Sequence, residues 1–297
     1  MRKFEISTDS TCDLYAYEIR EKELFFLPLT FTLTDKKGEI TEYKDEFKSP
    51  EEYVEYYDKL RSGIVSRTSM NNPFVHEEHF RKMAAAGVKD AIHFTISYGL
   101  CRTVDVAREA VEAVKKDYPE FNCLCVECNT TTVGQGFLVE MAVKMRDEGK
   151  TLKETFDYVE DVKKRFQHFI IADNLMYLMR GGRISATKAV VGTMLNVKPI
   201  IIFNKEGKLV NYKKERGMKK AVAAIAAEFE KYTLNKDFPT VFIGHTDNSE
   251  MAQYLSDLLR EKYGVTPVIR MIGPVIGSHL GPNCVAYAFS SNEERPM

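Results

Sequence analysis

Short runs of β-branched and apolar residues alternate with amphipathic helical stretches along this chain. Such alternation is typical of stacked βα units around a mostly parallel sheet, so it predicts an α/β fold. The predicted strands cover residues 3–8, 90–96 and 122–128. The predicted helices cover residues near 50–61, 74–86, 103–116 and 135–148, and Gly149 suits the end of the last one.

A second set of elements follows residue 150. Its pattern mixes apolar runs, a hairpin turn and helical spacing, so antiparallel pairing is expected beside helices. The predicted elements are a helix from Thr151 to about Phe166, an apolar strand at Phe169–Ala172, a hairpin between Lys198 and Glu215, and helices near 217–232 and 249–263.

The length of the chain bears on its division into domains. A single hydrophobic core usually stops growing at roughly 250–300 residues, and this chain has 297. We therefore expect two domains. Residues 1–160 should form an N-terminal domain with a mostly parallel, Rossmann-like sheet, and residues 161–297 a C-terminal domain with a mixed α/β fold.

Charge is nearly balanced, with 42 Lys and Arg residues against 43 Asp and Glu residues. Without a strong field or a basic recognition helix, the chain is not expected to bind nucleic acid. Charged residues appear at once after Met1, and no later stretch approaches the ~18 apolar residues of a membrane span. We expect a cytoplasmic protein without stable membrane insertion.

The six cysteines are dispersed, which suits a reduced chain better than a disulfide scaffold. Cys123, Cys125 and Cys128 form a cluster, but it lacks the paired spacing of zinc ligands and has no nearby His. These three residues are expected to be buried structural thiols, and no metal site is predicted.

Four hydroxyl-rich loops are expected to line one rim of the sheet. Ligands of open α/β sheets bind at the carboxyl ends of the strands, where helix N-termini direct backbone N–H groups into the crevice. Each loop alone could merely cap a helix. Together they form a cradle for one oxyanion, and their few Lys and Arg residues favour a carboxylate over a polyphosphate. The loops cover residues 7–11, 66–73, 97–103 and 129–132.

His279 is the histidine that the sequence marks for function. It lies in the segment Ile272–Pro282, where repeated Gly and Pro residues permit a sharp loop that holds a polar ring in place. A histidine in such a loop can donate to an anion or act as an acid or base.

The other histidines favour structural roles. His76 and His79 stand in a polar helix beside two glutamates, so we expect them on the solvated surface, with a metal-binding pair as the alternative. His93 lies inside a predicted strand and is expected in the core. His245 follows a strand and is expected to be structural or at a rim.

The segment Met179–Ser185 presents two arginines around the pair Gly181–Gly182. One interpretation is a turn between two helices with solvated charges. The other is a contact between Arg183 and a phosphate group or a partner, because a guanidinium offers fixed, planar donors.

These segments occur in the order and spacing of the bacterial DegV family, which the chain resembles from about residue 3 to about residue 290. The resemblance implies the DegV fold of two α/β domains and a bound long-chain fatty acid. It also implies a carrier without catalysis of its own, which presents the acyl carboxylate to an ATP-dependent fatty acid kinase for phospholipid synthesis. No cofactor is implied beyond the fatty acid. The matching segments are Asp9–Leu14, Thr68–Ser69, Ser97–Thr103, Gly181–Ile184 and Gly273–Gly281.

The resemblance also implies a set of site residues. Thr68 and Ser97 would bind the carboxylate of the fatty acid. His279, next to Ser278, would lie close to that headgroup, and Arg183 would contact the headgroup or the partner.

The chain departs from the family pattern beside this expected site. Tyr98 replaces the second serine of the loop that begins at Ser97, and Arg102 stands where glycine is usual. Where the family has T-S-x-P-S, this chain has Thr68-Ser69-Met70-Asn71-Asn72-Pro73. Tyr98 is therefore placed in the predicted headgroup site, and the bulkier groups bear on which ligand fits.

Two other functions stay open from the residues alone. One is an acyl hydrolase or phosphotransferase with His279 as the base and Ser278 or Ser97 as the nucleophile. No G-x-S-x-G elbow surrounds either serine. The other is a lipid-responsive or DNA-associated regulator, and the balanced charge argues against the DNA-associated role.

Overall fold

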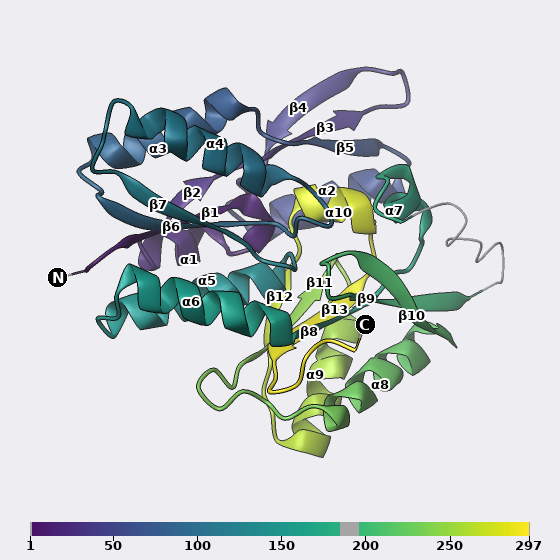
Figure 1. Ribbon diagram of the computed structural model, residues 1–297. Coiled ribbons are helices and arrows are strands. Elements are labelled where there is room, and N and C mark those ends of the chain that lie inside the picture. The colour runs from purple at the N-terminus through teal and green to yellow at the C-terminus, as the bar shows by residue number, and fades with distance from the viewer. Residues whose placement is uncertain (1, 185–195, 297) are drawn as a thin grey trace.

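The computed structural model describes residues 2–184 and 196–296. Within these residues the strands form three sheets, which the helices cover in layers (Figure 1). The helices are α1 (Ala16–Glu21), α2 (Pro50–Arg61), α3 (Pro73–Ala85), α4 (Thr103–Lys115), α5 (Val133–Asp147), α6 (Leu152–Val162), α7 (Met176–Arg180), α8 (Met218–Glu228), α9 (Ser249–Tyr263) and α10 (Pro274–Leu280).

The first sheet is parallel throughout, with the strand order β2-β1-β6-β7. Helices α3 and α4 cover one face, and α5 and α6 cover the other (Figure 1). This arrangement confirms the mostly parallel N-terminal sheet and the three strands predicted in it. The strands are β1 (Glu5–Asp9), β2 (Phe25–Leu27), β6 (Asp90–Thr95) and β7 (Asn122–Glu127).

The second sheet is mixed and has the order β10-β9-β8-β13-β11-β12. Only β11 and β12 pair in parallel, and β9 with β10 confirms the predicted hairpin. Helices α8 and α9 pack on one face, whereas α5 reaches the sheet from the side of the parallel sheet (Figure 1). The strands are β8 (Phe166–Ile171), β9 (Val197–Phe203), β10 (Leu209–Arg216), β11 (Val241–His245), β12 (Val268–Met271) and β13 (Val285–Ser290).

A third, antiparallel sheet has the order β4-β3-β5 and was not predicted. Its strands are β3 (Thr30–Thr34), β4 (Ile40–Lys44) and β5 (Val65–Ser69). Thr68 therefore lies in a strand, paired with Phe31, and not in a loop after a parallel strand. The short polar sequence of β5 lacks the apolar alternation that identifies a half-buried strand, which explains the wrong assignment.

Helix α10 corrects a second prediction, because His279 lies in a helix and not in a sharp loop. Gly273 is its N-cap residue, Pro274 opens its first turn, and Gly281 ends it with φ of 72°. Proline fits the first turn, where its missing N–H is not needed. The glycines thus bound a short helix that fixes the direction of the His279 side chain.

Hydrophobic packing continues across the predicted domain boundary. The ring of Phe137 from α5 lies 5.0 Å from Phe166 at the start of β8 and 5.7 Å from Phe242 in β11, measured between centroids. The division at residue 160 stays a prediction.

None of the helices within residues 2–184 and 196–296 combines the length and the apolar character that crossing a bilayer requires.

Candidate functional site

A largely apolar cavity lies where the three sheets meet. It contains about 780 Å³ of atom-free space, which includes its open mouth. All four predicted hydroxyl-rich loops contribute lining residues, among them Thr11, Ser69, Cys101 and Thr131. The apolar wall includes Leu29, Ile96, Ile170, Phe203, Ile272 and Ile276.

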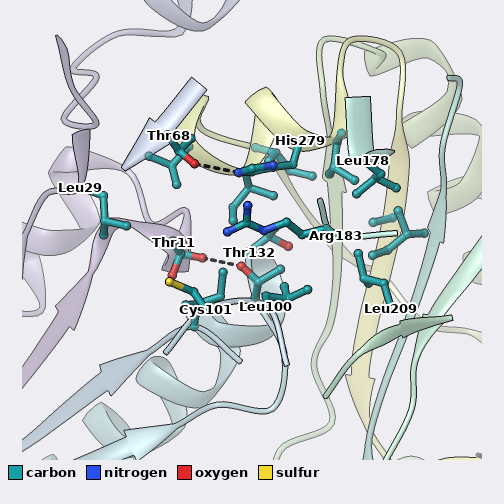
Figure 2. A pocket seen from close by; sticks show the side chains of 18 of the residues that line it. Thr11, Leu29, Thr68, Leu100, Cys101, Thr132, Leu178, Arg183, Leu209 and His279 are labelled. Carbon is teal, nitrogen blue, oxygen red and sulfur yellow. Dashed lines mark hydrogen bonds between the residues drawn. The ribbon is translucent and has the colours of Figure 1, made fainter. Parts of the chain in front are cut away.

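Thr68 and His279 meet at this cavity, as predicted. The distance between Thr68 Oγ1 and His279 Nε2 is 2.8 Å (Figure 2). Burial lowers the pKa of His279 to about 4, and the charge of Arg183 adds to the shift. The imidazole is therefore neutral at pH 7 and can donate one hydrogen bond while it accepts another.

Gly181 has a steric role that the sequence did not reveal. A Cβ atom at this position would lie 2.1 Å from His279 Nδ1, so any side chain would collide with the ring. Gly181, the first glycine after α7, thus makes room for His279. The second helix predicted after the pair Gly181–Gly182, together with Ser185, lies outside the described residues.

Arg183 extends into the same cavity. Its guanidinium lies between the Thr68–His279 pair and the opposite wall (Figure 2). One of its N–H groups donates to the carbonyl oxygen of Gly181 at 2.6 Å. Among the described residues no carboxylate forms a salt bridge with Arg183. A half-buried cation without an acidic partner can attract an anionic ligand.

The opposite wall carries a second group of polar side chains, formed by Thr11, Thr131, Thr132 and His168. The loop Asn129–Thr132 was predicted to border the site, and it does. His168 was not singled out, because nothing in the strand sequence around it distinguishes a cavity-lining histidine from a core residue. Its pKa is lowered to about 3, chiefly by burial, with Arg295 as a further cause.

Three predicted site residues have side chains that do not line the cavity. The Ser97 hydroxyl donates to the carbonyl oxygen of Gly207 at 2.7 Å, which fastens the hairpin turn to the end of β6. The Ser278 hydroxyl bonds Ser66 Oγ, Tyr56 Oη and the carbonyl oxygen of Pro274. Tyr98 is 46% exposed and stacks under Arg102.

These contacts bear on the hydrolase alternative. A serine nucleophile must share a hydrogen bond with its base. Ser278 and His279 are neighbours in sequence, but successive residues of a helix point about 100° apart. Ser278 faces α2 and β5, whereas His279 bonds Thr68. The pairs that the alternative needs, Ser278 or Ser97 with His279, are not formed.

The prediction for His76 and His79 was wrong, because both are buried, at 0% and 9% exposure. Ser7 Oγ lies 2.7 Å from His79 Nε2 and 2.8 Å from His93 Nδ1, inside the layer between α3 and the parallel sheet. Within the described residues no group of three or more His, Cys, Asp or Glu side chains could hold a metal ion. Cys123, Cys125 and Cys128 are buried free thiols, as predicted.

Comparisons with known proteins agree with the resemblance seen in the sequence. Residues 3–292 match the family model described as "Uncharacterised protein, DegV family". A DegV domain-containing protein of Clostridium perfringens is 35% identical over 297 residues, which is 100% of both chains.

Two solved structures share the fold along nearly the whole chain. A DegV family protein from Thermus thermophilus, described for its fatty acid binding, is 25% identical with a TM-score of 0.80, over 98% of this chain and 100% of its own. A DegV lipid binding protein from Thermotoga maritima is 24% identical with a TM-score of 0.83, over 99% of this chain and 100% of its own.

Proposed function

The chain belongs to the DegV family, and from that premise we propose that it binds a long-chain fatty acid. The carboxylate of the acid would lie against Arg183, Thr68 and His279, with its acyl chain in the apolar cavity. The observation that carries this proposal is the guanidinium of Arg183, which has no carboxylate partner among the described residues, beside the Thr68–His279 pair in a cavity that is otherwise largely apolar.

The two ends of a fatty acid would contribute differently. Each buried methylene stabilises the complex by about 0.8 kcal/mol, so the acyl chain supplies most of the affinity. The headgroup needs orientation and charge compensation. If His279 donates from Nε2 to Thr68 Oγ1, the hydroxyl hydrogen of Thr68 is free to donate to the carboxylate. Arg183 would supply the positive charge and further N–H donors.

We further propose that the protein acts as a carrier without catalysis of its own, as its family resemblance implies. It would present the carboxylate to an ATP-dependent fatty acid kinase, where a carboxylate oxygen bonds the γ-phosphorus of ATP and ADP leaves. The absence of a Walker loop in the sequence supports this division of labour. Hydroxylamine trapping should give acyl hydroxamate from the loaded protein with kinase and ATP, and none with ATP alone.

Native mass spectrometry of the purified protein tests the fatty acid proposal directly. We expect a bound C14 to C18 acid, a range that the family resemblance implies, or uptake of oleate or palmitate by an empty protein. Failure of both would refute the proposal.

The variant Arg183→Leu tests the headgroup contact. Loss of a hydrogen-bonded charge pair should weaken oleate binding by about 10- to 100-fold, as measured by fluorescence displacement. Arg180→Leu is the matched control, since Arg180 is exposed and lies 5.3 Å from the ring of Tyr177. Equal weakening in both variants would indicate general surface electrostatics in place of a specific contact.

A further inference from the structure

His168 offers an unused hydrogen-bonding atom at the wall of the cavity. It stands in β8, and its ring lies 5.4 Å from Phe203, which also lines the cavity. Nδ1 is 2.9 Å from Thr130 Oγ1, which fixes the ring. Nε2 is buried and has no hydrogen-bond partner among the described residues. An imidazole held in this way leaves one nitrogen for a ligand.

The hydroxyl group of Thr132 is a second hydrogen-bonding group at this wall. The backbone of Thr132 has φ of 53° and ψ of −134°, a conformation that β-branched residues rarely adopt. Its amide donates to the carbonyl oxygen of Thr11 at 2.8 Å, which helps to hold this conformation. The hydroxyl, however, is buried and has no partner in the described parts of the chain. Strained conformations of this kind occur often at ligand contacts.

The neighbouring hydroxyls on this wall are satisfied. Thr131 Oγ1 lies 3.5 Å from the carbonyl oxygen of Thr11. Thr11 Oγ1 donates within a cluster formed with Asp9 and Gln135. Two polar groups of the wall are therefore paired within the protein, and two are left over. Buried polar groups are nearly always hydrogen-bonded in native structures, so His168 Nε2 and the Thr132 hydroxyl call for a partner, as does His279 Nδ1 beside Gly181.

An unsubstituted acyl chain cannot be that partner, because methylene groups neither donate nor accept hydrogen bonds. A hydroxyl group on the chain can do both: it can donate to His168 Nε2 and accept from the Thr132 hydroxyl. We propose that this protein selects fatty acids that carry a hydroxyl group along the acyl chain. This inference rests on the proposed function, since it specifies which class of fatty acid the same cavity prefers.

Equilibrium binding of four C18 acids tests the inference. Stearic acid is compared with 3-, 10- and 12-hydroxystearic acid by displacement of a fluorescent fatty acid from the intact protein. We expect at least one hydroxystearate to bind about tenfold more tightly than stearate, because a site that leaves polar groups unpaired discriminates against the analogue that cannot pair them.

Three variants locate the source of this preference. Thr132→Val removes the hydroxyl and keeps the β-branched shape, and His168→Phe removes the ring nitrogens, so each should reduce the preference to about threefold or less. Thr41→Val is the matched control and should keep the preference, because Thr41 is exposed in β4 and does not line the cavity. Because Thr132→Val is nearly isosteric, it still tests the inference if His168→Phe fails to fold.

The outcomes separate the two proposals. If stearate binds the unaltered protein at least as tightly as every hydroxystearate, a water molecule satisfies the wall and the inference is wrong, while fatty acid binding stands. A preference that survives in both folded variants would also overturn the inference. If none of the four acids binds, the proposed function itself fails.

Discussion

Two groups in this protein pair a hydroxyl with an imidazole at nearly the same distance, one of them partly buried at the cavity and the other fully buried. At the cavity, Thr68 Oγ1 lies 2.8 Å from His279 Nε2. Between α3 and the parallel sheet, Ser7 Oγ lies 2.7 Å from His79 and 2.8 Å from His93. Burial lowers the pKa of all three histidines.

The difference lies in what surrounds each group. His279 borders an open cavity and faces the guanidinium of Arg183. His93 packs edge-on against Phe80, with centroids 5.1 Å apart, and neither His79 nor His93 borders that cavity. Short hydrogen bonds and shifted pKa values therefore do not identify a binding site by themselves. The cavity beside His279, and a guanidinium without a carboxylate partner among the described residues, do identify one.

The largest expected effect is on the closed cluster. Ser7→Ala leaves one nitrogen each of His79 and His93 without a partner, at about 1–3 kcal/mol for each buried group. Urea denaturation should therefore show a loss of roughly 2–6 kcal/mol in the free energy of unfolding, with unchanged fatty acid binding while the protein stays folded.

Ser62→Ala is the control for that measurement. The Ser62 hydroxyl donates to the carbonyl oxygen of Lys59 on the exposed end of α2, so its loss should change stability by no more than about 0.5 kcal/mol. A Ser7→Ala variant that keeps its stability but loses its ligand would abolish the distinction between the two groups.

A smaller effect concerns pH. Burial lowers the pKa of His76 from 6.5 to about 4 in the folded protein. Below pH 6.5 the unfolded chain therefore takes up a proton that the folded protein does not, which destabilises the fold until about pH 4. His76→Phe removes this term, so its free energy of unfolding relative to the unaltered protein should rise as pH falls through that window.

Denaturant titrations at pH 7.5, 6, 5 and 4.5 measure this difference, which should reach on the order of 1–2 kcal/mol near pH 5. The other titrating groups contribute to the free energies of unfolding of both proteins. Subtracting one free energy from the other removes these shared contributions. A difference that does not vary with pH would mean that His76 has the same pKa in the folded and the unfolded state.

The smallest effect is expected at the cavity pair. Thr68→Val keeps the shape of the side chain and removes one donor to the carboxylate, so oleate should bind about fivefold more weakly with little change in stability. Ser97→Ala should behave in the opposite way, because Ser97 donates to Gly207 and not to the cavity. If Ser97→Ala weakens binding more than Thr68→Val does, the carboxylate contacts the Ser97 loop instead.

Helix α3 was predicted correctly, but the exposure of its two histidines was not. The two glutamates beside His76 and His79 suggested a solvated surface. Yet His76, His79, Phe80 and Met83 follow the spacing i, i+3, i+4, i+7, and all four are buried. Phe80 and Met83 mark the inner face of the helix, so the burial of the two histidines could have been predicted from the sequence.

Other features could not be found in this way. Strand β4 is exposed at every residue and β5 is polar, so neither carries the alternation that predicts a strand. Position 181 requires a glycine because the ring of His279, 98 positions away in sequence, leaves no room for a Cβ atom. Such dependences arise from contacts between distant segments, which no window of neighbouring residues contains.

The sequence alone determined the α/β alternation, the hairpin, the polar segments that follow β1, β6 and β7, and the candidates Arg183 and His279, because these depend on periodicity, turn chemistry and residue type. Thr68 was singled out by the family resemblance. Tertiary structure decided which hydroxyls face the cavity. It turned Ser278 toward Tyr56 and Ser66, engaged Ser97 with Gly207, and placed His168 and Thr132 on the cavity wall. A side chain's direction follows from how whole elements pack, and that is settled only when distant parts of the chain meet.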